Sequence, residues 1–121
     1  MTDFDRLHTT GDIRAVFAAR TVAHGPAMVV HARRRSDDGP ARATVVVGRK
    51  VGDAVRRNRA KRRLRAALHQ TSAPRGLDVV VVGRSPALTA DFSALTGEVA
   101  RLLDRVSDKA GTPPQAAGSA A

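Results

Sequence analysis

The segment VVVGRKVGDAVRRNRAKRRLRAAL, residues 45–68, joins an apolar run directly to a dense group of cations. Residues 49–65 contain nine Lys or Arg and a single acid, Asp53. The Val-rich part is typical of a buried strand, and a short loop at 48–52 follows it. The cationic part has the spacing of a helix that begins near Asp53, a suitable N-cap, and ends near His69. The segment therefore predicts a strand, a short loop and a strongly basic helix.

One side of this basic helix is apolar. At about 100° per residue, Ala60, Leu64, Ala67 and Leu68 fall within an arc wide enough to pack against a sheet. Cations cover well over half of the circumference, and no Glu stands four residues before them to offset their charge. Like charges at this spacing destabilise a helix by roughly 0.2–0.5 kcal/mol per pair. We therefore expect an anionic partner rather than a merely solvated face.

Before this segment, the apolar spacing predicts one helix and two strands. Ile13, Val16 and Phe17 recur at helical spacing after polar residues that can cap a helix. Residues 20–35 have the pattern of two short strands around a His-Gly-Pro turn. The strand that leads into the basic helix is expected over residues 42–48.

After the basic helix, residues 77–84 predict a buried strand and residues 91–106 a last helix, because their apolar residues keep strand and helix spacing. Residues 107–121 are rich in Pro, Gly, Ala and Ser, so we expect a disordered tail behind one domain over residues 1–106. The predicted class is α+β, an α/β sandwich of order α-β-β-β-α-β-α with one four-stranded sheet and packed helices. General rules make its β-α-β crossover right-handed.

The composition restricts the class of partner. The chain has 121 residues, a net charge of +10 and no Cys, which excludes disulfides and thiolate metal sites. A domain with this much positive charge is expected to bind a partner with many phosphates or an anionic membrane. No apolar run approaches the roughly 20 residues that span a bilayer, and the apolar side of the basic helix is small for an interfacial helix. The start of the chain lacks the apolar core of a signal peptide, so the cytoplasm is the simplest location.

The type of cation favours nucleic acid, and the order of elements favours RNA. Arg outnumbers Lys in the basic helix, and Arg binds phosphate through two N–H groups and stacks on bases. A helix-turn-helix needs a second helix just before the basic one, where this chain has a strand. An RNA recognition motif presents aromatic residues on its strands, and these strands have none. The residues therefore favour a basic helix, packed on a sheet, that binds RNA backbone.

No catalytic set stands out in the protein. There are no paired carboxylates, no Ser-His-Asp arrangement and no metal-ligand cluster of convincing spacing. The four His residues (8, 24, 31 and 69) are scattered, which is more typical of surface or partner-facing positions than of ligands. Residues 48–52 lack the GxxxxGK[ST] spacing of a nucleotide-binding loop. The sequence predicts neither a catalytic residue, nor a metal ligand, nor a small-molecule substrate.

Three stretches together resemble the protein subunit of bacterial ribonuclease P. The basic segment has the signature of that family: Arg49-Lys50, Gly52, then Arg57-Asn58-Arg59, Lys61-Arg62 and Arg65. RLHTTGDIRAVF, residues 6–17, is similar to the family's opening helix, and LDVVVVGRSPAL, residues 77–88, is similar to its strand after the basic helix. The resemblance covers most of the chain, and its length makes it more specific than Arg-Asn-Arg alone.

The resemblance implies a fold and a function. The family's sandwich holds its basic helix in an unusual left-handed β-α-β crossover, contrary to the general rule. Its members bind a large catalytic RNA to form an endoribonuclease that removes the 5′ leader from precursor tRNA. The RNA, with Mg²⁺, performs the hydrolysis. The protein binds the single-stranded leader in a cleft and assists RNA folding and metal binding, so the catalytic centre lies in the RNA.

The resemblance also implies roles for twelve residues. The residues that would bind the catalytic RNA are Arg57, Asn58, Arg59, Lys61, Arg62 and Arg65. The residues expected in the leader cleft are Ile13, Phe17, His31, Arg49, Lys50 and Arg84. Many relatives have an aromatic residue at the position of Ile13 and Tyr at that of His31. Since stacking on an aromatic ring contributes about 1–3 kcal/mol per base, this chain would bind the leader more weakly or depend on Phe17 and His31.

Three other classes of function stay open on the residues alone. A non-enzymatic RNA-binding protein, such as a small ribosomal protein, has a similar composition. A DNA-binding regulator is disfavoured by the missing helix-turn-helix order. A nuclease that acts without RNA is disfavoured because no acidic cluster for Mg²⁺ is evident.

Overall fold

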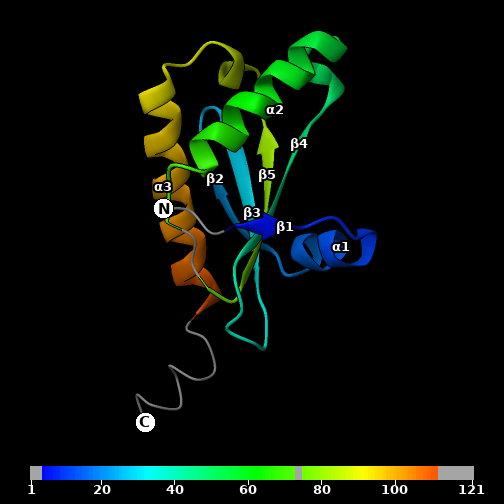
Figure 1. Ribbon diagram of the computed structural model, residues 1–121, viewed down its shortest axis with the longest axis vertical. Helices are drawn as coiled ribbons and strands as arrows, with labels where there is room; N and C mark the ends of the chain where they lie inside the picture. The colour runs from blue at the N-terminus through cyan, green and yellow to red at the C-terminus, as the bar shows by residue number, and fades with distance from the viewer. Residues whose placement is uncertain (1–3, 73–74, 112–121) are drawn as a thin grey trace.

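The computed structural model describes residues 4–72 and 75–111, which form one five-stranded sheet with three α-helices packed on it (Figure 1). In chain order the elements are β1 (Asp5–Arg6), α1 (Thr10–Ala18), β2 (Thr21–His24), β3 (Met28–Arg34), β4 (Arg42–Val47), the 3₁₀ turn η1 (Arg49–Val51), α2 (Ala54–Leu68), β5 (Leu77–Gly83), the 3₁₀ turn η2 (Ser85–Leu88) and α3 (Phe92–Ala110). The predicted α+β class and the order of the predicted elements are confirmed. Among the described residues, no helix is both long and apolar enough to cross a membrane.

The sheet has five strands rather than the predicted four. Its order is β1-β4-β5-β3-β2, with β4 parallel to β5 and the β2-β3-β5 pairs antiparallel. The additional strand, β1, has only two residues and pairs in parallel with β4. Hydrogen bonds from Asp5 N to Ala41 O (2.7 Å) and from Leu7 N to Ala43 O (3.0 Å) hold it there. Two residues are too few to show the alternation that identifies a strand in a sequence.

The crossover from β4 through α2 to β5 is left-handed. In Figure 1 both strands point upward, α2 lies in front of the sheet, and β5 lies to the left of β4. The general rule predicted the opposite hand, whereas the family resemblance implied this one. The left-handed connection places the basic helix α2 over the parallel strands β4 and β5.

Helix α2 forms where the sequence predicted it, between Asp53 and His69. Asp53 Oδ1 accepts a hydrogen bond from the backbone N–H of Arg56 at 3.0 Å, so it caps the helix. The predicted apolar side is buried: Ala60, Leu64 and Ala67 have no exposed surface, and Leu68 has 4%. Leu64 packs on β5 where the chain has Gly83; a Cβ there would lie 2.7 Å from Leu64 Cδ1. The absent side chain lets the helix lie close to the sheet.

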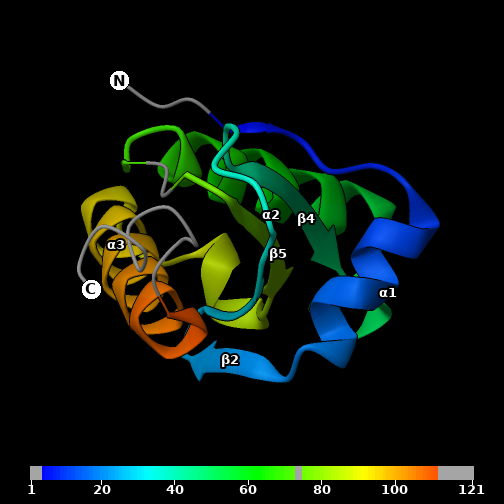
Figure 2. The same ribbon diagram turned by 90° about the horizontal axis from the view of Figure 1, so that it is seen from below.

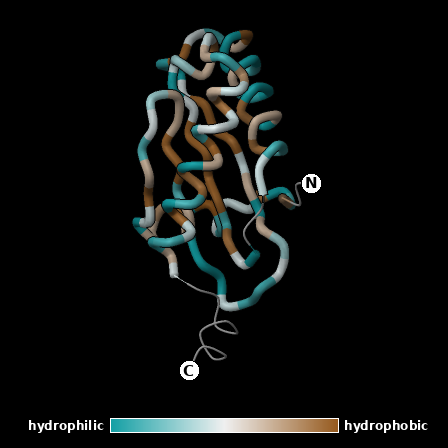
Figure 3. Tube along the Cα trace, turned by 90° about the vertical axis from the view of Figure 1, so that its left-hand side faces the viewer, coloured by the Kyte–Doolittle hydropathy of each residue, from teal (hydrophilic) through white to brown (hydrophobic). Residues whose placement is uncertain are grey.

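The two faces of the sheet carry different helices. Helices α2 and α3 pack on one face in a core that includes Val30, Val79, Leu95 and Val99. Helix α1 covers part of the other face, where Val16 packs against Leu7 and Val80. Figure 2 shows α1 and α3 on opposite sides of the strands, and Figure 3 shows that the central strands are the most hydrophobic part of the chain.

The last helix ends later than the predicted Val106. Helix α3 continues to Ala110 because the last turn is attached to the sheet, with Lys109 Nζ donating to the carbonyl of Val22 at 2.7 Å. Arg34 donates from Nη2 to the carbonyl of Gly111 at 2.7 Å. The remainder of the predicted tail, residues 112–121, lies outside the described residues.

Candidate nucleic-acid interface

The six predicted RNA-binding residues all lie on α2, and four of them lie on the side away from its buried stripe. Asn58, Arg59, Arg62 and Arg65 are exposed. Lys61 is half-buried beside the apolar side, as the helical spacing indicated. The exposed guanidinium groups make no hydrogen bond or ion pair with any other residue in the described part of the chain. They are available to phosphate without the loss of an internal contact.

Two cations of α2, one of them the predicted RNA-binding residue Arg57, are bound by the protein itself. The half-buried Arg57 donates from Nη1 to the carbonyl of Gly52 at 2.9 Å, which holds the loop before the helix. Arg63 donates to the carbonyls of Ala87, at 2.6 Å, and Ala90. Arg63 therefore attaches η2 to α2, and its guanidinium group stabilises the fold. The sequence could not distinguish it from its neighbours, since its acceptors lie 24 and 27 residues away.

Phe17 and His31 form a pair on the opposite face of the sheet. Their ring centroids are 4.7 Å apart at an interplanar angle of 62°, an edge-to-face contact between α1 and β3. Phe17 is 41% exposed, while Ile13 is half-buried against the small core under α1. Burial lowers the pKa of His31, and the nearby charge of His24 lowers it further. The neutral imidazole is thus the favoured form, and the pair presents ring surface to solvent.

The other three predicted cleft residues line a separate hollow of about 640 Å³. It lies where β4 and β5 end, and its lining includes Arg49, Lys50 and Arg84. All three cations are exposed, and Arg84 donates from Nη1 to the carbonyl of Gly25 at 3.5 Å. Val82 lines this hollow and also packs against the core under α1. The six residues predicted for the leader cleft therefore lie in two sites, one around the ring pair and one in the cationic hollow. Val82 borders both sites.

A buried ion cluster that the sequence did not predict attaches α1 to the sheet. Asp78 of β5 has no exposed surface and accepts from Arg35 Nη1 at 2.6 Å and from Arg42 Nε and Nη2 at 2.8 and 2.7 Å. Arg42 also contacts Asp12 of α1 at 3.3 Å. The hydrogen bond to Asp78 raises the pKa of Arg42, and the hydrogen bond from Thr9 lowers that of Asp12. Both groups stay ionised, and the ion pair between Arg42 and Asp12 links α1 to the cluster.

The acidic side chains of the described residues do not gather into a site for a divalent cation. Within residues 4–72 and 75–111, no three His, Asp or Glu side chains lie close enough to hold a metal ion. Asp78 and Asp12 are bound by Arg, and Asp53 is bound by the start of α2. Mg²⁺ prefers several oxygen ligands, so this donor set does not fit a magnesium ion held by the protein.

The chain is similar in sequence to known proteins over most of its length. Residues 1–107 match the family described as Ribonuclease P. A protein of Gluconacetobacter diazotrophicus named ribonuclease P protein component is 41% identical over 101 residues, which are 81% of this chain and 87% of that protein. The protein of the same name from Symbiobacterium thermophilum is 36% identical over 102 residues, 83% of this chain and 89% of its own.

Solved structures have the same fold. The RNase P protein of Thermotoga maritima, in complex with 1-(4-fluorophenyl)-2-thiourea, is 29% identical and aligns with a TM-score of 0.71 over 84% of this chain and all of its own. The RNase P protein of Staphylococcus aureus, at 23% identity, shares the fold with a TM-score of 0.68 over 82% of this chain and 92% of its own. Because the family match covers residues 1–107 and the Gluconacetobacter and Symbiobacterium proteins are 41% and 36% identical over more than four-fifths of the chain, this chain belongs to the ribonuclease P protein component family.

Proposed function

We propose that this chain is the RNA-binding subunit of ribonuclease P, which removes the 5′ leader from precursor tRNA together with a catalytic RNA. The observation that carries the proposal is the exposed face of α2, where Arg59, Arg62 and Arg65 form no ion pair within the described residues. Several guanidinium groups in one row bind RNA phosphates and release counterions. The protein then contributes binding and orientation, while Mg²⁺, held by the RNA, supplies the hydrolytic chemistry.

The leader is assigned to the opposite face. The ring pair of Phe17 and His31 offers a surface on which an unpaired base can stack. The cationic hollow with Arg49, Lys50 and Arg84 continues this surface toward the ends of β4 and β5. A single strand that crosses both would place bases on the rings and phosphates on the cations. Its separation from α2 by the sheet lets the protein bind the leader and the catalytic RNA at once.

A cleavage assay tests the proposal. A 5′-labelled precursor tRNA is incubated at low Mg²⁺ with the cognate catalytic RNA alone, with the protein alone and with both. We expect efficient formation of the mature 5′ end only in the mixture. If the protein adds nothing to its RNA, it serves another RNA particle, and ribosomal RNA that copurifies with it would identify that alternative. If the protein cleaves alone, the assignment of the catalytic centre to RNA is wrong.

Phe17→Ala is expected to weaken leader binding about tenfold, because it removes the ring on which a base stacks. The measurement compares the affinity of the holoenzyme for precursor tRNA with and without the leader. Phe92→Ala is the matched control, since Phe92 is also 41% exposed but lies at the start of α3. An equal loss for tRNA that lacks the leader, or an equal loss in the control, would contradict the leader assignment.

A further inference from the structure

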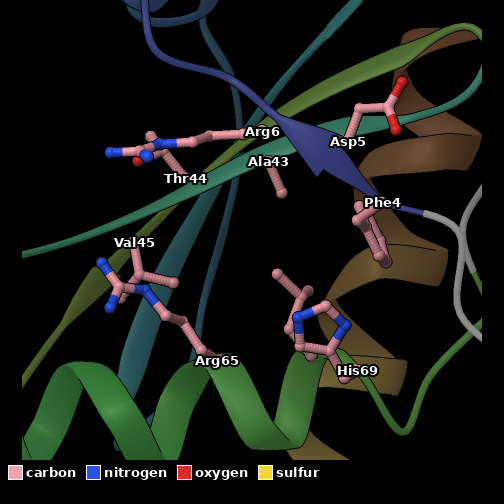
Figure 4. A pocket seen from close by; sticks show the side chains of 9 residues that line it. Phe4, Asp5, Arg6, Ala43, Thr44, Val45, Arg65 and His69 are labelled. Carbon is pink, nitrogen blue, oxygen red and sulfur yellow. The ribbon is translucent and has the colours of Figure 1, made fainter.

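A second hollow, of about 330 Å³, lies between the N-terminal strand and the basic helix. It is on the α2 face of the sheet, away from the ring pair and the cationic hollow. Figure 4 shows its two walls: residues of β1 and β4 on one side and residues of α2 on the other. The residues that line it are Phe4, Asp5, Arg6, Ala43, Thr44, Val45, Arg65, Leu68 and His69.

The hollow joins a cationic end to an apolar base. Arg6 and Arg65 extend toward the same end from opposite walls, and the rings of Phe4 and His69 lie at the other end (Figure 4). Both Arg side chains are exposed, and within the described residues neither donates a hydrogen bond or forms an ion pair. Asp5, the one acid among the lining residues, points its carboxylate away (Figure 4). An anionic group could therefore bind both guanidinium groups without displacing a carboxylate of the described residues.

The base of the hollow is made of side chains that belong to the core. Ala43, Val45 and Leu68 are 8%, 5% and 4% exposed, and Phe4 packs against the same core while remaining half-buried. A volume near 330 Å³ is at the lower end of the range for small-ligand sites, roughly 300–1,000 Å³. The hollow thus has apolar side chains at its bottom, an aromatic ring at one end and two guanidinium groups at the other end. These features are complementary to a ligand with a flat aromatic group and a phosphate. A nucleotide has this chemistry, and a base-paired helix is too large to enter.

We propose that the hollow between β1 and α2 binds one unpaired nucleotide of the partner RNA. Its nucleobase would lie against Phe4 and the buried apolar side chains of the hollow, and its phosphate would contact Arg6 and Arg65. The proposal rests on the proposed function, because the partner is the RNA that the exposed face of α2 binds. Arg65 is shared between that face and the hollow, so a nucleotide that leaves the RNA helix on α2 reaches the hollow directly. Arg6 then becomes an RNA-binding residue outside the basic segment.

A pair of substitutions tests the contribution of Arg6. Arg6→Ala is expected to weaken the affinity for the cognate RNase P RNA about tenfold, because a charge-assisted contact to phosphate is lost. The slope of log affinity against log salt should fall by about 0.7–0.9. Arg101→Ala removes the same charge from the exposed side of α3 and is expected to change the affinity less than about twofold. Equal effects of the two substitutions would overturn the role of Arg6.

A photocrosslinking experiment tests the occupant. Phe4 is replaced with p-benzoylphenylalanine, and a second variant carries the same probe in place of Arg62. Crosslinks from position 4 to a single unpaired nucleotide support the proposal, and deletion of that nucleotide with its phosphate should abolish the difference between wild type and Arg6→Ala. Crosslinks from position 62 but not from position 4, or crosslinks from position 4 only to paired nucleotides, overturn the proposal and leave the RNA interface on α2 intact. Absence of crosslinks from both positions would mean that the interface on α2 itself is wrong.

Discussion

Asp78→Asn is expected to lower the free energy of unfolding by about 3–5 kcal/mol, since breaking a buried ion pair leaves charge without compensation. The carboxylate of Asp78 has no exposed surface, and the side chain of Arg35, which binds it, is only 10% exposed. A neutral amide cannot accept from three guanidinium N–H groups at once. Urea denaturation of both proteins at neutral pH measures the difference.

Asp37→Asn is the matched control for this substitution. Asp37 also pairs with Arg35, at 3.0 Å, but its side chain is 62% exposed. Exposed ion pairs contribute roughly 0.2–1 kcal/mol, so this variant should remain close to wild type. If Asp78→Asn were no more destabilising than Asp37→Asn, the cluster would not be what holds the sheet and α1 together.

Replacing Arg59 and Arg62 together with Gln is expected to weaken binding to the catalytic RNA about a hundredfold near physiological salt. Each side chain is exposed on α2 and free of internal partners among the described residues, so the folded structure should be unaffected. Loss of two phosphate contacts should also reduce the slope of log affinity against log salt by about 1.4–1.8. Filter binding or fluorescence anisotropy over a range of salt concentrations gives both quantities.

The control for the double substitution is Arg101→Gln with Arg105→Gln. These two residues are exposed on α3, and the change in net charge is identical. An equal loss of affinity in the control would mean that binding depends on total charge and not on the face of α2. Arg63 is unsuitable for either variant, because its guanidinium holds η2 and its loss would disturb the fold.

Much of the position of α2 could be predicted because the signals are local. Asp53 as N-cap, the apolar spacing from Ala60 to Leu68 and the polar residues between them depend only on neighbours within one or two turns. The parallel strands on either side were recognisable from their Val content for the same reason. The end of α3 was predicted too early, since the contact that retains its last turn, from Lys109 to Val22, spans 87 residues.

The sequence by itself determined the elements, their order and the cationic face of α2, because each depends on the period of nearby side chains. Only the tertiary structure decided which cations are free. Arg63 is bound to carbonyls more than 20 residues away, and Arg42 is bound to an aspartate 36 residues away, whereas Arg6 and Arg65 meet across one hollow. Contacts of this kind depend on how the crossover and the short β1 strand bring distant segments of the chain together. The pattern of neighbouring residues in the sequence does not predict which distant segments will be in contact.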